Sequence, residues 1–258
     1  MTDLPLNEAG ARFELGRVVG QTFAVLGRNF LVFFPLALVL VGIPQFGSIY
    51  ASGLMIGTDA PDLLATVGIT IAGVVFPILL QGALIRGVVD DLRGDKVRIG
   101  AMVGDAFRAA VSLFVVAILM GLGLTLGFML LIVPGLFLAV RWAVAAPAAV
   151  VERVAPTSAL GRSADLSRGN RWSVFGLVLI WGAVMLATTF GLEIAFGVFG
   201  AGPEGLLALY TGFTYGAVSA VLGTILALIN AVGVAALYVE LRRVKEGVDV
   251  SDLAKVFA

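Results

Sequence analysis

The stretch VSLFVVAILMGLGLTLGFMLLIV occupies residues 111–133, and after Pro134 and Gly135 the stretch LFLAVRWAVAAPAAVV fills residues 136–151. The two stretches together contain a single charged residue, Arg141. A helix of about 20 apolar residues crosses the roughly 30 Å hydrocarbon core of a membrane, and Pro-Gly is a turn signal. We therefore predict a hairpin of two membrane helices, of which the second spans only about 24 Å.

The composition of the whole chain agrees with this hairpin. Of 258 residues, 60% are hydrophobic and 13% are charged, whereas soluble domains carry about 25% charged residues. The predicted fold class is therefore all-α, a polytopic membrane helix bundle with about six transmembrane helices in one integral membrane domain over residues 1–258. The six apolar stretches are Phe30–Tyr50, Leu64–Val88, Val111–Val133, Leu136–Val151, Val174–Phe199 and Thr214–Tyr238.

The basic residues predict the orientation, because short cytoplasmic loops are enriched in Lys and Arg. Every second connection is basic, and the first, third and fifth loops contain no Lys or Arg. Both termini are therefore predicted to be cytoplasmic, with residues 1–29 and 240–258 flanking six spans in residues 30–239. Interfacial aromatics are expected near span ends, at Tyr50, Trp172, Tyr210 and Tyr238. Apart from Arg141, the basic residues are Arg12, Arg17 and Arg28; Arg86, Arg93, Lys96, Arg98 and Arg108; Arg153, Arg162, Arg168 and Arg171; and Arg242, Arg243, Lys245 and Lys255.

Three connections on the basic side have apolar residues at helical spacing, which favours amphipathic helices on the cytoplasmic face. They are residues 13–30, 99–110 and 157–167. Gly247 is expected to stop the last helix, and Asp249 to cap a short turn ending at Phe257. Because residues before the first span include Asp3, Glu8 and Glu14 and lack a basic leader, we expect the first span to be retained.

The chain contains no cysteine and no histidine. Disulfides, thiol chemistry, imidazole metal ligands and His-based acid–base catalysis are thereby excluded for these residues. No Gly-rich phosphate loop or metal-spaced carboxylate cluster is present, and Asp90, Asp91 and Asp95 are expected to form a solvated turn. We predict no cofactor, no metal and no nucleic-acid partner.

A family resemblance rests on residues near the fifth span and at the end of the sixth. The motifs are ALGRS at 159–163, LSRGNRW at 166–172, FG at 175–176, YVELR at 238–242 and KEG at 245–247. The turn at Val133–Gly135, with Pro147 and Glu152, matches the same pattern. The chain resembles the membrane domain of bacterial glycerophosphoryl diester phosphodiesterases and related stand-alone six-span proteins of poorly defined function.

This resemblance implies a location in the bacterial inner membrane but not phosphodiesterase activity. In those relatives, hydrolysis belongs to a separate soluble barrel that uses a His pair and carboxylates around a divalent metal. The chain has no His, so hydrolysis by this polypeptide is not expected.

Eight residues inside predicted spans, or beside them, are candidate site residues. Arg141 and Glu193 are predicted deep in hydrocarbon, where an ion pair, a gate or separate snorkelling to the interface are alternatives. Gln81 and Asn230 favour hydrogen bonds between helices, with a water path as the alternative. Arg162, Arg168 and Arg171 beside Trp172 form a candidate lipid headgroup site, although they also serve to orient the protein.

These residues predict a non-enzymatic scaffold, accessory or lipid-interacting component of the membrane. The alternative is a transporter or channel for a small or lipid-like substrate, which requires a polar cavity around Arg141, Glu193 or Asn230. The expected partners are membrane lipids. Another membrane protein or a second copy of the chain are further candidates, since Gly123xxxGly127 and Gly212xxxGly216 offer small-residue faces.

Overall fold

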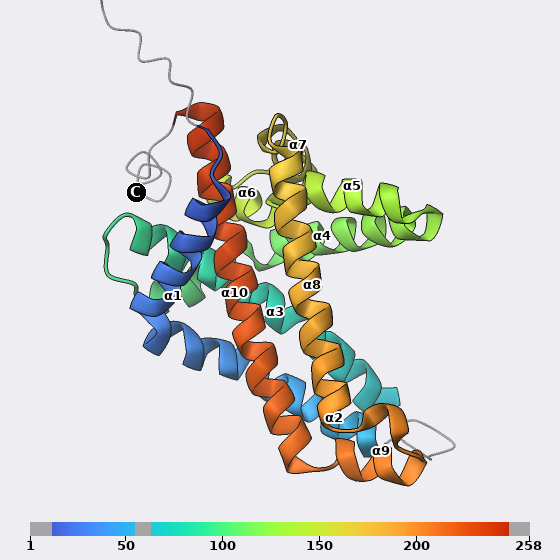
Figure 1. The fold of residues 1–258 in the computed structure, drawn as a ribbon. Coiled ribbons are helices and arrows are strands. Elements are labelled where there is room, and N and C mark those ends of the chain that lie inside the picture. The colour runs from blue at the N-terminus through green and yellow to red at the C-terminus, as the bar shows by residue number, and fades with distance from the viewer. Residues whose placement is uncertain (1–11, 55–62, 248–258) are drawn as a thin grey trace, which may run out of the picture.

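The computed structural model describes residues 12–54 and 63–247, and all regular structure in these ranges is helical (Figure 1). Six helical stretches are long and apolar enough to cross a membrane. The chain is a multi-pass membrane protein, and the predicted all-α bundle is confirmed. In order, the elements are α1 (Leu15–Ala37), the π-helical turn η1 (Leu38–Gly42), α2 (Ile43–Leu54), α3 (Leu63–Leu92), α4 (Ile99–Leu130), α5 (Ile132–Trp142), α6 (Ala145–Glu152), α7 (Pro156–Leu166), α8 (Arg171–Ala195), the 3₁₀ turn η2 (Val198–Gly200), α9 (Pro203–Tyr210) and α10 (Phe213–Glu246).

The first predicted surface helix and the first span form one bent element. The bend lies at Asn29, whose φ of −114° and ψ of 15° leave the helical region. The Asn29 side-chain amide donates to the Val25 carbonyl at 3.0 Å and to the Asp91 carboxylate at 2.6 Å. Such side-chain bonds compete with the regular helix ladder. The boundary predicted at Phe30 therefore lies next to a change of direction, not at the start of a helix.

The central helix, α10, packs against α1, α2 and α3. Small buried residues on α10, among them Ala231, Ala235 and Ala236, allow this close approach. Gly216 of the predicted Gly212xxxGly216 face lies against α2, because a Cβ there would come within 2.9 Å of the Phe46 ring. This glycine therefore serves packing within the chain.

The α4–α5 hairpin is present, but its turn lies before Pro134. The chain reverses at Leu131, which is extended at φ −167° and ψ 159°. Pro134 lies in the first turn of α5, where a missing N–H has no cost in helix hydrogen bonds. Gly135 serves close packing of the two helices and not the turn, since a Cβ on Gly135 would lie 2.5 Å from the Phe128 ring of α4.

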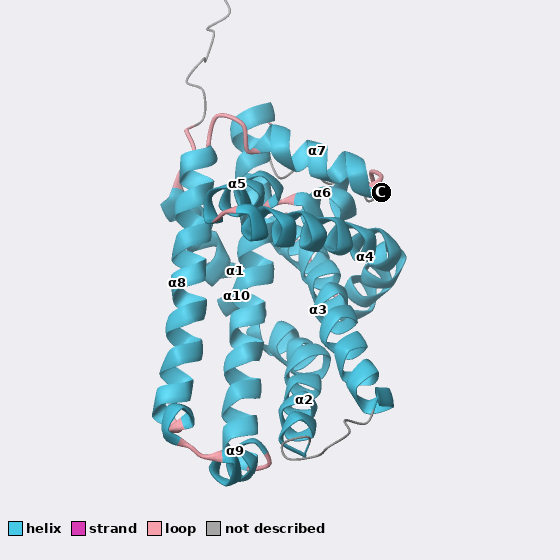
Figure 2. Cartoon of the chain, turned by 90° about the vertical axis from the view of Figure 1, so that its right-hand side faces the viewer, coloured by secondary structure: helices cyan, strands magenta, loops and turns pink. Residues whose placement is uncertain are grey.

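The fourth predicted span, Leu136–Val151, is broken in two. The helix stops after Trp142, and the buried α6 begins at Ala145. The Val144 N–H donates to the Ser163 Oγ of α7 at 3.1 Å, which satisfies a backbone group exposed by the break. In Figures 1 and 2 the α4–α5 hairpin runs across the direction of α8 and α10 instead of along it.

The ends of the surface segments follow their glycine signals. Gly247 has φ +62° at the end of α10 and Gly169 has φ +97° just after α7, a conformation that glycine adopts without strain. The predicted helix at 157–167 is α7, which starts one residue earlier with Pro156. The predicted helix at 99–110 is instead continuous with its span in α4. The turn expected from Asp249 to Phe257 lies outside the described residues.

Candidate functional site

Charged residues from distant segments meet at one end of the bundle, which we call the basic end. The groups come from the start of α1, the end of α3, the start of α4, α6, α7 and the end of α10. The basic clusters of the sequence thus converge in space. Helices α2 and α9 lie at the opposite end of the bundle (Figures 1 and 2).

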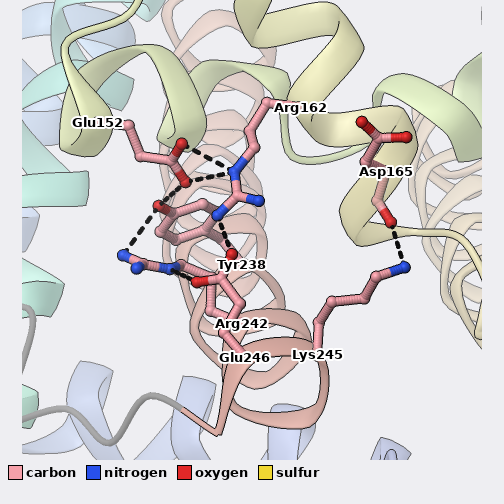
Figure 3. A network of polar contacts seen from close by, with 7 residues as sticks. All are labelled: Glu152, Arg162, Asp165, Tyr238, Arg242, Lys245 and Glu246. Atoms are coloured by element: carbon pink, nitrogen blue, oxygen red, sulfur yellow. Dashed lines mark hydrogen bonds and ion pairs between the residues drawn. The ribbon is translucent and has the colours of Figure 1, made fainter.

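Part of this convergence is a polar network that joins α6, α7 and α10 (Figure 3). Arg162 Nε contacts both Glu152 carboxylate oxygens at 2.9 and 2.8 Å, and the Arg162 guanidinium also pairs with Glu246. The Tyr238 hydroxyl donates to Glu152 Oε1 at 2.8 Å, and Arg242 Nε donates to Glu246 at 2.8 Å. The network is balanced in charge, which is typical of a structural cluster.

The electrostatics of Arg162 reflect this environment. Burial lowers the pKa of its guanidinium, but hydrogen bonds and attraction from Glu246 and Glu152 outweigh burial and raise the pKa overall. Arg162 therefore stays charged and engaged with protein carboxylates. Tyr238 is only 1% exposed, so its predicted role as an interfacial aromatic is wrong; its ring lies inside the bundle with its hydroxyl in the network.

A second buried carboxylate, Glu240, ties the start of α1 to α10. It is 1% exposed and accepts from Arg243 Nη2 at 2.7 Å and from the Glu14 backbone N–H at 3.3 Å. Arg17 lies 3.7 Å from its other oxygen. These contacts satisfy the carboxylate, which is the condition for burying one.

Three neighbouring hollows open between α3, α4 and the α6–α7 connection, and we call them together the basic groove. Their volumes are about 550, 330 and 260 Å³. The first and second share Asp105, Arg108 and Arg153, and the second and third share Arg86 and Ala101. The charged lining residues are Arg86, Lys96, Arg98, Arg108 and Arg153 with Asp90, Asp95 and Asp105, an excess of two positive charges.

The carboxylates of the groove hold some of its cations in place. Arg86 bridges Asp90 at 2.9 Å and Asp105 at 3.1 Å, and Arg108 contacts Asp105 at 2.9 Å while its side chain stays 80% exposed. The predicted solvated turn of mixed charge is wrong for Asp90, which is only 5% exposed, and Asp91 is taken up by Arg28 and Asn29. Arg108 is thus positioned by a carboxylate and still open to a ligand.

Arg153 has an unusual backbone conformation at the edge of the groove. Among the described residues it is the one non-glycine with positive φ, at 50°, and it closes the C-terminal end of α6. A bulky residue in this region costs of order 1–3 kcal/mol and such strain gathers at functional sites. Arg153 lines two of the three hollows together with Arg108, so the strained backbone lies in the wall of the groove.

The first hollow also has an apolar wall. Ala109, Ala149, Val150, Val154 and Pro156 line it beside the cations. Ser112 lines it as well, and its buried Oγ has no hydrogen-bond partner among the described residues. An unpaired buried hydroxyl is a ready donor for a polar ligand. The groove therefore combines anion-binding groups with a surface suited to hydrocarbon.

The structure does not bring Arg141 and Glu193 together. Arg141 lies at the end of α5, close to the start of α8, where the Arg171 guanidinium lies 5.4 Å over the Phe137 ring. Glu193 lies in the last turn of α8, about 33 Å further along that helix at 1.5 Å per residue. A pair or gate between these two residues is therefore ruled out by distance.

Gln81 and Asn230 make no hydrogen bond to another helix within residues 12–54 and 63–247. An interhelical amide bond is instead made by Gln45, whose Nε2 donates to the Ser219 carbonyl of α10 at 3.3 Å. None of the three hollows is lined by Arg141, Glu193 or Asn230. The polar cavity required by the transporter alternative is thus not found among them.

The residues of the predicted lipid headgroup site do not share one environment. Arg162 is engaged by Glu152 and Glu246, whereas Arg168 lies 3.4 Å from Asp165 and remains 70% exposed. Trp172 is 82% exposed at the start of α8. The exposed Arg168 and Trp172 remain a candidate headgroup contact, separate from the basic groove.

Sequence reasoning missed the groove. Its local signals were the spacing of Arg86 and Asp90 four residues apart and of Asp105 and Arg108 three residues apart, which places each pair on one helix face. The meeting of α4 with the α6–α7 connection depends on contacts between segments more than 40 residues apart in the chain. Comparison of the chain with known protein families, with characterised proteins and with solved structures finds no match.

Proposed function

We propose that this chain is a non-enzymatic, lipid-interacting protein of the bacterial inner membrane, and that the basic groove binds the phosphate headgroup of an anionic phospholipid. The observation that carries the proposal is the joint lining of two hollows by Arg108 and Arg153. Guanidinium groups bind phosphate oxygens through paired, charge-assisted hydrogen bonds. The groove has the excess positive charge that such a ligand needs.

The apolar wall of the first hollow supports a lipid over a free anion. Val150, Val154 and Pro156 lie beside Arg108 and Arg153, so a phosphate there has hydrocarbon-compatible surface next to it. The Ser112 hydroxyl provides a neutral donor for an ester or glycerol oxygen. Helix α4 then continues from the groove into its apolar half, along which an acyl chain can lie.

We further propose, on the Arg168–Trp172 and Tyr238–Arg242 motifs, that the chain is related to stand-alone proteins resembling the phosphodiesterase membrane domain. No catalytic activity is included in this proposal. Tyr238 of the second motif donates to Glu152 at the end of α6, and Glu152 also accepts from Arg162, so the chemistry of these residues is that of a structural joint.

The test is native mass spectrometry of the purified protein with anionic and zwitterionic phospholipids. The variant Arg108→Gln with Arg153→Asn removes the two cations that line both the first and the second hollow, and Asn is chosen because it tolerates the left-handed conformation. We expect retention of anionic lipid to fall by about tenfold, the scale of one to two kcal/mol for a lost charged contact. Zwitterionic lipid should be affected less.

The matched comparison is Arg168→Gln with Arg171→Gln, which removes the same number of charges at the alternative position. Unchanged lipid retention in this variant, with loss in the groove variant, supports the groove. The reverse pattern would place the headgroup beside Trp172, and no loss in either variant would contradict a specific lipid site. Inorganic phosphate offered alone distinguishes a free anion from a lipid headgroup.

A further inference from the structure

The α4–α5 hairpin carries an uncharged, exposed tip. No Asp, Glu, Lys or Arg lies between Arg108 and Arg141. At the tip, Met129 to Val133 are each 68–83% exposed, and further out-facing apolar side chains include Leu122, Leu126 and Phe137. A helix pair that is apolar on all sides belongs in a hydrocarbon environment.

The root of the hairpin is held at the basic end. Ser163 of α7 accepts from the Val144 N–H at 3.1 Å and donates to the Arg141 carbonyl at 3.0 Å. The Ser167 hydroxyl, whose shorter bond goes to the Ser163 carbonyl at 2.8 Å, lies 3.4 Å from the Val140 carbonyl. Helix α7 is itself tied to the end of α10, because Lys245 Nζ donates to the Asp165 carbonyl at 2.8 Å. The C-terminal end of α5 therefore lies at the same depth as the charged residues of the basic end.

The length of α5 limits how far the hairpin can reach from that root. With 11 residues it extends about 16 Å, even if fully upright. The hydrocarbon core is roughly 30 Å thick. The tip at Leu131 thus reaches about the middle of the membrane at most, and less in the transverse orientation seen in Figures 1 and 2.

Close packing makes the hairpin one stiff unit. A Cβ on Gly123 would lie 2.3 Å from the Trp142 ring, and a Cβ on Gly127 would lie 2.9 Å from the Gly135 Cα. The Gly123xxxGly127 pattern is therefore used between α4 and α5, within one chain. With its small-residue face occupied, the hairpin presents large apolar side chains outward.

We propose that the α4–α5 hairpin is inserted in one leaflet only, the leaflet at the basic end, and that its outward-facing apolar surface contacts acyl chains. The chain then crosses the membrane four times, through α1–α2, α3, α8 and α10. Four crossings and six crossings both place the two termini on the same side. The basic loops before and after the hairpin also lie on that side in both cases, so the alternation of basic loops does not distinguish the two topologies. This inference does not rest on the lipid headgroup site.

The absence of cysteine in the sequence allows a direct test with single cysteines in the full-length protein. Leu131→Cys and Ile132→Cys mark the tip, Thr211→Cys marks the opposite end of the bundle, and Arg168→Cys marks the basic end. In intact cells, a membrane-impermeant maleimide should label Thr211→Cys, and Arg168→Cys only after permeabilisation. We expect neither tip cysteine to be labelled, in intact cells or after permeabilisation.

A fluorophore on the same tip cysteines gives the second measurement, in vesicles containing lipids with nitroxides at mid-chain. Strong quenching together with no aqueous labelling supports insertion in one leaflet. Labelling of Leu131→Cys from outside, as for Thr211→Cys, would overturn the proposal in favour of a crossing hairpin. Labelling from the inside, or protection without quenching, would overturn it too, because the tip would then contact water or protein.

Discussion

The Tyr238 hydroxyl lies 2.8 Å from Glu152 Oε1 and donates a hydrogen bond to it, although 86 residues separate the two in the chain. This bond joins the final helix to the end of the short buried α6. Since Glu152 also receives Arg162, the pair connects three helices at the basic end.

Replacing Tyr238 with Phe removes the hydroxyl and keeps the buried ring. Glu152 then retains Arg162 but loses one donor, so we expect the free energy of unfolding to fall by about 1–2 kcal/mol. Thermal unfolding of the detergent-solubilised protein measures this loss. Tyr50→Phe is the control, since Tyr50 is 45% exposed and should be neutral; equal stability of the two variants would contradict the structural role of the bond.

Gly127→Ala tests the close contact within the α4–α5 hairpin. The new methyl group would lie 2.9 Å from the Gly135 Cα, which is backbone and cannot rotate away. We expect destabilisation of about 1–3 kcal/mol from overpacking. Gly121→Ala on the same helix has open space around its Cβ and should leave stability equal or slightly higher, because alanine favours helix. Similar unfolding temperatures for both variants would argue against the contact.

Glu240→Gln tests the joint between α1 and α10. The buried carboxylate accepts bonds from Arg243 and from the Glu14 N–H, and neutralising it weakens both. Arg17 and Arg243 remain partly exposed at 41% and 27%, so water can compensate them, and we expect a loss of about 1–3 kcal/mol. Protease sensitivity near Arg17 should rise in parallel. Glu204→Gln, an exposed carboxylate on α9, should change neither property.

Much of the fold could be predicted because its signals are local. The apolar runs and their lengths give the six helical stretches, and Gly169 and Gly247 mark helix ends through their own backbone preference. The break of the fourth stretch after Trp142 has no such signal. It depends on Ser163, 19 residues away from Val144, accepting the freed N–H.

The candidate site was less predictable because it, too, depends on contacts between segments that are far apart in the chain. The predicted pair of Arg141 and Glu193 followed from hydrophobic burial alone, which says how deep a residue lies in a span but not which span is its neighbour. Arg108 and Arg153 line the same hollow only because α4 passes the α6–α7 connection. Tyr238 likewise reads as an interfacial aromatic from its place near a span end, whereas packing of α6 against α10 buries it.

The bend at Asn29 provides a prediction about shape. Its side-chain amide takes the Val25 carbonyl and Asp91 as acceptors, and Asn29→Ala removes both bonds while leaving a strong helix former. Spin labels at Val19→Cys and Val39→Cys, both exposed, report the end-to-end distance across the bend. A straight helix would separate these two backbone positions by about 30 Å, so we expect the distance to lengthen toward that value in the variant.

The control for this measurement is Asp91→Asn, which weakens the contact to α3 but keeps the Asn29 bond to Val25. If the side-chain bond to the helix itself sets the bend, Asp91→Asn should keep the short distance while Asn29→Ala does not. An unchanged distance in Asn29→Ala would mean that packing against α3 and α10 holds the bend without the amide. Since Arg28 also pairs with Asp91 at the end of α3, the Asp91→Asn variant should in addition loosen the α1–α3 contact, seen as broader distance distributions without a shift of their maximum.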